Sequence, residues 1–260
     1  MILKKELSIA KDAAVKAGKA IMEIYSDSGI QIEYKKDSSP LTAADKESDK
    51  IITNLLKMNF PSYAILSEES QDDLQRLEND FCFVVDPLDG TKEFIKRNGQ
   101  FTVNIALAYK HISVLGVIYV PVTGELYYAC QGEGSYRQSA DGVTEKLHVS
   151  DRTDLPSLRV VLSNSHGCPE MDELLKKYNL TNFVKVGSSL KGCMVAEGKA
   201  DVYYRFNPTM EWDTAAMQCI AEEAGAIFRQ MDGSAMTYNR EDSLNAKGFY
   251  IINHESNLLV

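Results

Sequence analysis

The chain has 260 residues, of which 44% are hydrophobic and 25% charged, so it can bury a sizeable core in one large or two smaller domains. The formal net charge of −9 argues against nucleic acid polymers and anionic membranes as general partners. No apolar stretch reaches the roughly 18 residues of a membrane span, and we find no signal-peptide pattern. Five scattered cysteines without metal-ligand spacing are typical of reduced thiols, so we expect a cytoplasmic protein.

The first part of the chain predicts two helices and then an antiparallel sheet. Apolar residues recur every three or four positions from Leu3 to Ile24, which indicates one face of a long amphipathic helix. A second helix is expected to open at Thr42. Short apolar runs separated by Pro and Gly favour an antiparallel sheet. We expect the strands of this sheet at 101–109, 114–120 and 126–129, and separate strands at 30–36, 64–66 and 81–85.

The pattern changes near Ser150, where expected strands begin to alternate with expected helices. Such alternation indicates α/β architecture. The strands are expected at 159–163, 183–186 and 201–204, and the helices at 171–178, 188–197 and 214–224. We therefore divide the chain into an N-terminal α+β half, residues 1–150, and a C-terminal α/β half, residues 151–260.

Two carboxylates stand three residues apart just after the apolar run Phe81–Val85. Buried or crowded carboxylates such as Asp86 and Asp89 are costly unless a cation neutralises them. Gly90 and Thr91 follow on an expected tight turn and can direct backbone N–H groups toward an anion. This stretch predicts a place where a metal ion meets a phosphate.

Five carboxylates occupy strand ends or helix starts, the positions that line ligand crevices in α/β proteins. They are Asp45, Glu68, Asp86, Asp89 and Asp213. Each also has a structural interpretation: Asp45 as part of a capping box, Glu68 as a solvated loop residue, and Asp213 as a helix N-cap. Asp86 and Asp89 also suit a simple turn. No His or Cys joins them at ligand spacing, and an all-oxygen set favours Mg²⁺ or Mn²⁺ over zinc.

Three segments that contain these residues resemble the signature motifs of the Mg²⁺-dependent, lithium-sensitive phosphatases, which include inositol monophosphatase and fructose-1,6-bisphosphatase. The segments are Ser67–Ser70, Asp86–Thr91 and Glu211–Ala216. The chain looks most like the bacterial 3'(2'),5'-bisphosphate nucleotidases of this superfamily, because further segments are similar. These are 92–95, 99–107, 187–191 and 207–213. The resemblance covers nearly the whole chain and implies a layered αβαβα fold of the sugar-phosphatase type.

The resemblance implies a metal centre with two or three Mg²⁺ ions, with Mn²⁺ as an alternative and with Li⁺ and Ca²⁺ as inhibitors. Its ligands are Glu68, Asp86, the backbone carbonyl of Leu88, Asp89 and Asp213. The implied catalytic residues are Asp45, Thr91 and Glu69. Glu69 holds a metal-bound water, while Asp45 and Thr91 form a short relay that orients and deprotonates a water for attack on phosphorus.

The implied substrate is adenosine 3',5'-bisphosphate, which loses its 3'-phosphate to give AMP, and 3'-phosphoadenylyl sulfate is a second candidate. The substrate-binding residues carried over are Gly90, Thr91, His166, Ser188, Lys191 and Arg205. Each base also has an ordinary interpretation as a solvated lysine, a loop histidine or a surface arginine. Asn164 stands where a basic residue is expected, and Gly192 where a larger one is expected, which leaves the fine substrate preference open.

Two other functions stay open at this point. An inositol or sugar monophosphatase on the same scaffold is the alternative within the enzymes. A catalytically silent nucleotide-binding protein is the alternative outside them, although every carboxylate of the set is intact. We expect a monomer or a homodimer, and docking on the cytoplasmic face of the inner membrane is left open.

Overall fold

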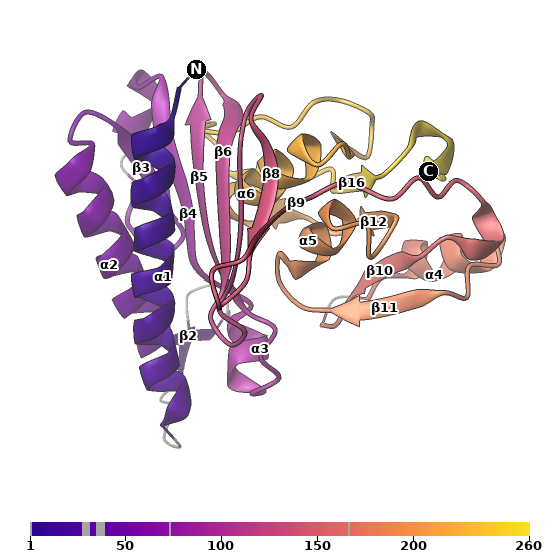
Figure 1. The fold of residues 1–260 in the computed structure, drawn as a ribbon, viewed down its shortest axis with the longest axis horizontal. Coiled ribbons are helices and arrows are strands. Elements are labelled where there is room, and N and C mark those ends of the chain that lie inside the picture. Colours follow the sequence, from indigo (N-terminus) through magenta and orange to yellow (C-terminus); the bar gives the residue numbers. More distant parts are fainter. Residues whose placement is uncertain (1, 28–31, 35–39, 73, 166) are drawn as a thin grey trace.

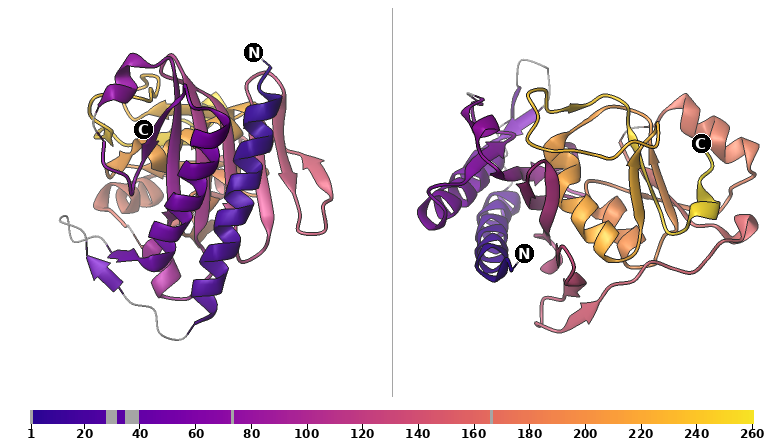
Figure 2. Two further views of the ribbon diagram at one scale, coloured as in Figure 1. Left: turned by 90° about the vertical axis from the view of Figure 1, so that its left-hand side faces the viewer. Right: turned by 90° about the horizontal axis from the view of Figure 1, so that it is seen from above.

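The computed structural model describes residues 2–27, 32–34, 40–72, 74–165 and 167–260. In this part of the chain the elements stack as helix, sheet, helix, sheet and helix (Figure 1; Figure 2, right). The expected αβαβα layering is confirmed. None of the described helices combines the length and the apolar character needed to cross a membrane.

The outermost layer on the N-terminal side is a pair of helices, α1 (Lys4–Ser26) and α2 (Ala43–Asn59). They lie side by side in front of the first sheet (Figure 2, left). Ala10, Ala14 and Ala17 are buried on α1, and such small side chains let the helix approach its neighbours closely. A short antiparallel pair, β1 (Ile32–Tyr34) and β2 (Pro40–Thr42), leads into α2. The predicted strand at 30–36 therefore survives as 32–34 among the described residues.

The first sheet has the order β3-β4-β5-β6-β7-β8-β9 within the described chain. Its strands are β3 (Ala64–Ser67), β4 (Phe81–Asp89), β5 (Thr102–Tyr109), β6 (Ile112–Val120), β7 (Glu125–Cys130), β8 (Gly134–Gln138) and β9 (Thr144–Lys146). All neighbours pair antiparallel except β3 and β4, which run parallel. Alternate side chains divide between two cores: Phe83 and Val85 face α1 and α2, whereas Val84 faces the opposite side.

The central layer consists of α5 (Leu190–Ala196) and α6 (Glu211–Glu223), which lie between the two sheets. The core around α6 contains residues of both predicted halves, for example Ile118 on β6 and Phe249 on β16. Gly116 on β6 lets α6 approach, because a Cβ there would lie 2.4 Å from the carbonyl oxygen of Ala216. The division at residue 150 stays a prediction.

The second sheet has the order β11-β10-β12-β16-β14 in the described part of the chain, and α4 (Pro169–Lys177) lies on its outer face. Its strands are β10 (Val160–Ser163), β11 (Phe183–Val186), β12 (Val202–Arg205), β14 (Ile227–Gln230) and β16 (Phe249–Ile252). The remaining short elements are η1 (Gln75–Glu78), α3 (Thr91–Ile95), η2 (Leu155–Ser157), β13 (Thr209–Met210), β15 (Leu244–Asn245) and η3 (Glu255–Asn257).

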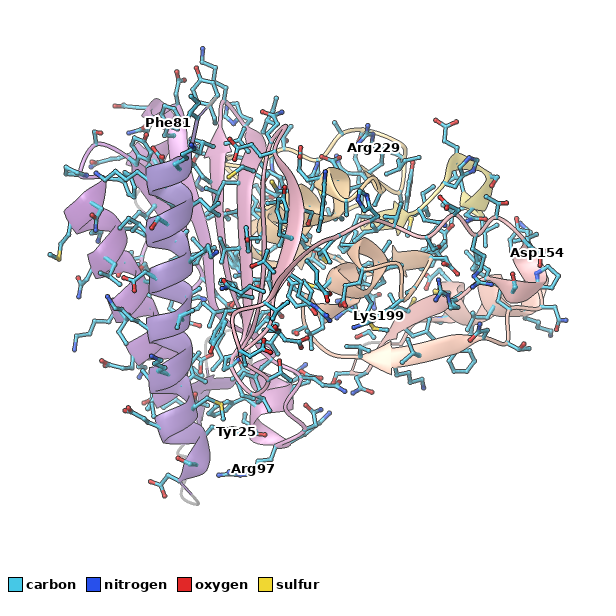
Figure 3. All side chains as sticks on the ribbon, in the orientation of Figure 1. Tyr25, Phe81, Arg97, Asp154, Lys199 and Arg229 are labelled. Carbon is cyan, nitrogen blue, oxygen red and sulfur yellow. The ribbon has the colours of Figure 1, made fainter. Side chains whose placement is uncertain are left out.

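Side chains fill the space between the layers and tie down the end of the first sheet near α3 (Figure 3). Arg97 lies over the ring of Tyr25 at 5.3 Å, and Tyr25 packs edge-on against Phe101 at 4.9 Å. All five cysteines are free, and four of them are buried, as expected for structural thiols. The contacts of Tyr25 with Arg97 and Phe101 join the end of α1 to the segment that follows α3.

Three sequence-based expectations need correction. Asp86 and Asp89 lie within strand β4, not on a turn after it, and the turn is confined to Gly90. Helix α6 begins at Glu211, so Asp213 is inside its first turn and is not the N-cap. Helix α5 begins at Leu190, because Ser188 has a φ of +49° that a helix cannot accommodate.

Gly116→Ala should destabilise the protein, because the added methyl group meets the backbone of α6. Overpacking of this kind lowers the free energy of unfolding by about 1–3 kcal/mol, and a backbone carbonyl can move aside less easily than a side chain. Thermal unfolding monitored by circular dichroism measures the loss. Gly167→Ala is the matched control, since a Cβ at that position has open space around it. Equal melting temperatures for the two variants would contradict this account of the contact.

Candidate active site

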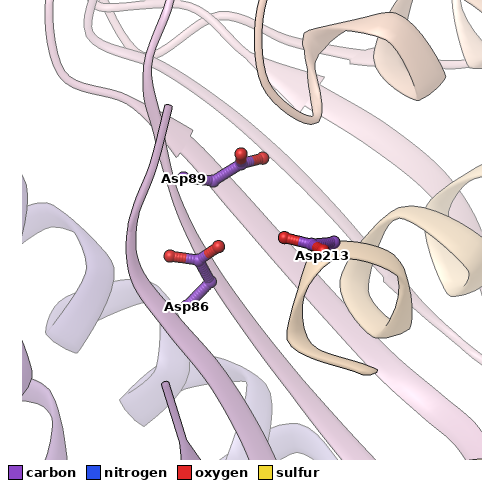
Figure 4. A group of neighbouring side chains, drawn as sticks. All are labelled: Asp86, Asp89 and Asp213. Carbon is purple, nitrogen blue, oxygen red and sulfur yellow. The ribbon is translucent and has the colours of Figure 1, made fainter. Parts of the chain in front are cut away.

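Three aspartates converge where the first sheet meets the start of α6. Asp86 and Asp89 come from β4, and Asp213 comes from the first turn of α6 (Figure 4). Each offers a carboxylate oxygen, and these oxygens all lie within 4.8 Å of one another. The structure thus brings together residues that are more than a hundred positions apart in the sequence.

The two aspartates of β4 share a face because the strand contains a bulge. Residues three apart normally point to opposite faces of a sheet. Asp86 pairs with Asn104 and Asp89 pairs with Thr102, so three steps on β4 match two steps on β5. The extra residue turns both carboxylates toward α6 and leaves Leu88 in the core on the other side.

Hydrogen bonds hold this bulge in place. Pro87 lacks an N–H group and therefore suits a position that is unpaired in the ladder. Ser48 on α2 donates to the Pro87 carbonyl at 2.6 Å, and the Leu88 N–H donates to Asp86 Oδ1 at 3.1 Å. The local sequence and the neighbouring helix together fix the direction of both carboxylates.

The carboxylate of Asp213 caps the start of α6 and is also part of the cluster with Asp86 and Asp89. Its Oδ2 accepts a hydrogen bond of 2.6 Å from the backbone N–H of Met210, the N-cap residue. That bond fixes the carboxylate relative to the helix. The predicted structural role at a helix start and the predicted place in the acidic cluster therefore coexist.

Two polar residues that the sequence reasoning did not single out hold Asp89. The backbone N–H and the hydroxyl of Ser189 each donate to Asp89 Oδ2 at 2.6 Å. Asn104 Nδ2 donates to the same oxygen at 3.2 Å. Both residues belong to segments that supported the family resemblance, but neither residue type by itself points to a carboxylate across the chain.

Burial and the neighbouring negative charges raise the pKa values of Asp86 and Asp213. Burial raises the pKa of Asp86 well above its usual range, and Glu68 and Asp89 raise it further. Burial, with a contribution from Asp89, raises the pKa of Asp213 to about 7. A divalent cation relieves this conflict, and the all-oxygen donors match the preference of Mg²⁺ or Mn²⁺. The residues present therefore fit the metal that the sequence predicted.

Thr91 and Asp45 lie within hydrogen-bond distance, as the relay requires. The Thr91 hydroxyl donates to Asp45 Oδ1 at 3.0 Å. Asp45 Oδ2 also accepts from the backbone N–H of Thr42 at 2.8 Å, which forms the predicted capping box of α2. Burial raises the pKa of Asp45, while the hydrogen bonds from Thr42 and Thr91 lower it.

A cavity of about 530 Å³ opens above these groups. It is lined by most of the predicted site residues: Glu68, Asp86, Leu88, Asp89, Gly90, Thr91, Ser188, Lys191, Arg205 and Asp213. Asp45 and Glu69 do not line it. Glu69 follows Glu68 in the same loop, and its charge raises the pKa of Asp86. His166 lies outside the described residues. Trp212, Tyr203 and Phe249 also line the cavity, although the sequence reasoning had not named them.

The cations Lys92, Lys191 and Arg205 line the same cavity as the acids. Lys191 is 7% exposed, donates to the Ser188 carbonyl and lies 5.6 Å from the centre of the Tyr203 ring. Burial lowers its pKa to about 8, although Asp89 acts in the opposite direction. Among the described residues, the buried Ser188 hydroxyl and Arg205 Nε have no hydrogen-bond partner. Such atoms suit a polar ligand.

Arg205 also lines a second cavity of about 190 Å³ that adjoins the first. Ser163 and Tyr203 are the other residues that border both cavities. Met171, Leu175 and Phe183 give the second cavity apolar walls. The site therefore combines acids and cations in one cavity with an adjoining cavity whose walls are partly apolar and partly polar.

Comparisons with known proteins agree with this geometry. Residues 3–257 match the inositol monophosphatase family. The 3'(2'),5'-bisphosphate nucleotidase CysQ of Salmonella typhimurium is 43% identical over 90% of this chain and 94% of its own length. The crystal structure of CysQ from Bacteroides thetaiotaomicron is 42% identical, with a TM-score of 0.84 and coverage of 96% of this chain and 98% of that chain. An inositol monophosphatase from Anabaena is 26% identical, with a TM-score of 0.79 over 99% of this chain and 94% of that chain.

Without metal, the protein should lose stability as the pH rises from about 4 to about 7. The pKa of Asp213 is about 7 in the folded protein, above the 3.8 of an unperturbed aspartate, so the folded protein holds a proton that the unfolded chain has lost. Stability is therefore highest below the unfolded pKa and falls as the pH approaches the folded one. Melting temperatures of EDTA-treated protein across this window measure the effect.

Asp213→Asn is the control for this pH dependence, because an amide does not titrate. The variant should show a shallower decline of melting temperature over the same window. Saturating Mg²⁺ should flatten the decline in the wild type by replacing the proton. A variant that declines as steeply as the wild type would contradict the assignment to Asp213.

Proposed function

The chain belongs to the inositol monophosphatase family, and on that premise we propose that it is a phosphomonoesterase that converts adenosine 3',5'-bisphosphate to AMP and phosphate. The observation that carries this proposal is one cavity whose lining includes the clustered Asp86, Asp89 and Asp213 together with the cations Lys191 and Arg205. A substrate with two phosphates needs both parts: a metal site for the reacting phosphate and cations for the other. 3'-Phosphoadenylyl sulfate is a second candidate substrate.

The family is metal-dependent, and the acidic cluster is the place where this chain would hold two or three Mg²⁺ ions. The proposed ligands are Glu68, Asp86, the Leu88 carbonyl, Asp89 and Asp213. When bound, Mg²⁺ supplies positive charge for the phosphate oxygens and lowers the pKa of water in the site. Buried, mutually repelling carboxylates with oxygen donors are the observation on this structure that supports the assignment.

The side chains near the reacting phosphate position and deprotonate a water. Thr91 donates its hydroxyl hydrogen to Asp45, so its oxygen can accept a hydrogen bond from the attacking water. As the bond from water oxygen to phosphorus forms, a proton of that water moves through Thr91 to Asp45. The bond from phosphorus to the ribose oxygen breaks, the ribose oxygen takes a proton from a second water, and Asp45 returns its proton to the solvent. Glu69, which the family resemblance assigns to a metal-bound water, is proposed to hold a further water. No side chain forms a bond to phosphorus in this scheme.

The second phosphate is assigned to Lys191, Arg205 and the Ser188 hydroxyl. The last two offer buried polar atoms without partners among the described residues. At pH 7 a lysine with a pKa of about 8 is mostly protonated, and a neighbouring phosphate would raise that pKa further. Gly90 and Thr91 complete the set by turning backbone N–H groups toward the reacting phosphate. The second cavity, which Arg205 also lines, adds room for a nucleoside.

An inositol or sugar monophosphatase is the second candidate, because the fold is shared with proteins of that name. A monophosphate has no group that requires the buried Lys191 and the partnerless Arg205 Nε. These two residues therefore favour the bisphosphorylated nucleotide.

Phosphate release from a panel of substrates at equal concentration tests the proposed function. With Mg²⁺ present, adenosine 3',5'-bisphosphate should turn over faster than inositol 1-phosphate or adenosine 3'-phosphate. Asp89→Asn should reduce turnover by about 1,000-fold or more, since the metal supplies several kcal/mol of transition-state stabilisation. Asp12→Asn, on the exposed face of α1, is the matched control. Faster turnover of inositol 1-phosphate would favour the second candidate.

Lys191→Met should act on the second phosphate and not on the reacting one. Loss of a buried charge contact costs about 2–5 kcal/mol, so kcat/KM for adenosine 3',5'-bisphosphate should fall at least about 30-fold, mainly through KM. Adenosine 3'-phosphate lacks the second phosphate and should be affected much less. Steady-state kinetics with both substrates measure the difference, and Lys57→Met on the exposed end of α2 serves as control. Equal losses on the two substrates would refute the assignment.

A further inference from the structure

A chain of hydrogen bonds, buried from Arg76 onward, joins the loop after β3 to the start of α6. The loop at one end of this chain of hydrogen bonds carries Glu68 and Glu69, and the start of α6 at the other end carries Asp213. Both ends therefore lie next to acids of the site, although they are far apart in the sequence. The members of the chain, in order, are Asp72, Arg76, Asn239 and Glu211. We refer to these four residues as the polar bridge.

Arg76 forms the first half of the polar bridge. Its side chain is 3% exposed, and its Nε and Nη2 donate to Asp72 Oδ2 at 3.0 and 2.8 Å. Nη1 donates to Asn239 Oδ1 at 2.9 Å, a geometry that the planar guanidinium fork favours. Asn239 Nδ2 donates back to the carbonyls of Arg76 and Asn79 at 3.1 and 3.2 Å. The side chain of Asn239 is thereby locked against η1.

Glu211 forms the second half and is fully buried. Its Oε2 accepts from the backbone N–H of Asn239 at 2.5 Å. Its Oε1 accepts from the backbone N–H and the Nε of Arg240 at 3.0 and 3.2 Å. Because Glu211 is the first residue of α6, these bonds fix the helix start two residues before Asp213.

The charges along the bridge alternate, which explains how Arg76 and Glu211 can be buried. Asp72 and Glu211 are negative, whereas Arg76 and Arg240 are positive, and each acid pairs with an arginine. Pairs of this kind add little net stability compared with apolar residues, but they specify one arrangement of the groups that they join. A role in placing other residues fits them better than a role in stability alone.

We propose that the polar bridge holds the loop that carries Glu68 at a fixed position relative to Asp213. Arg76, Asn239 and Glu211 are therefore positioning residues for the metal site. The inference rests on the metal site of the proposed function. Mg²⁺ demands near-ideal octahedral geometry with ligands at about 2.1 Å, so a small displacement of one arm weakens binding. The loop and α6 belong to different layers, and the bridge ties them together directly.

Asn239→Gly tests the bridge with little disturbance of the backbone. Asn239 has a φ of +57°, a conformation that glycine adopts without strain, so the variant removes the side-chain link and keeps the main-chain path. Asn179→Gly is the matched control, because Asn179 is exposed after α4 and has a φ of +51°. Both variants make the same chemical change in the same backbone conformation.

Calorimetric titration of Mn²⁺ into metal-free protein is the measurement. Asn239→Gly should weaken Mn²⁺ binding by about 10- to 100-fold, the usual effect of losing a group that orients a ligand, and Asn179→Gly should leave it unchanged. The Mg²⁺ concentration for half-maximal phosphatase activity should rise in parallel, while kcat at saturating Mg²⁺ largely recovers. A merely structural role would lower the melting temperature without moving the Mn²⁺ affinity.

Wild-type Mn²⁺ affinity in folded Asn239→Gly would overturn the inference and leave the proposed function intact. If that variant does not fold, Arg76→Lys decides, since a lysine ammonium keeps the charge but cannot span Asp72 and Asn239 as the fork does. Weaker Mn²⁺ binding in Arg76→Lys supports the bridge, and unchanged binding overturns it. Absence of Mn²⁺ binding in the wild type would overturn the proposed function together with the inference.

Discussion

Repulsion among the carboxylates of the acidic cluster is the constraint on which the arrangement of the site depends. Asp86 is almost fully buried, and Glu68, Asp89 and Asp213 all raise its pKa. A fold that gathers such groups must hold them against their mutual repulsion. The holding force comes from the two cores on either side of the first sheet, which pack β4 between α2 and α6. A cation then turns the unfavourable cluster into a binding site.

The geometry of the cluster comes from two local irregularities in otherwise regular elements. The bulge in β4 moves Asp89 to the same face as Asp86, and the early start of α6 directs Asp213 toward them. Gly116, which lies outside the cluster, also affects its geometry, because it lets α6 lie close enough to the sheet for the three carboxylates to meet. Small changes in any of these features would separate the acids while leaving the fold intact.

The sequence predicts the elements and the acids well, and it predicts their partners poorly. Apolar periodicity located α1 and β11 to within a few residues, and the three motifs identified every acid of the cluster. Ser189 and Asn104 could not be found in this way, because their bonds to Asp89 depend on how distant layers stack. The polar bridge was missed for the same reason. Local patterns report on neighbours along the chain, whereas these contacts join segments that only the fold brings together.

The acids of the site also show why a structural and a functional interpretation of one residue need not compete. Asp45 and Asp213 each occupy the third position of a helix and accept the backbone N–H of the N-cap residue through Oδ2. That bond fixes the side chain to a rigid helix start. In Asp45 it leaves Oδ1 for Thr91, and in Asp213 it leaves an oxygen for the cluster. The capping pattern that makes each aspartate look ordinary in the sequence therefore also fixes the direction of its carboxylate.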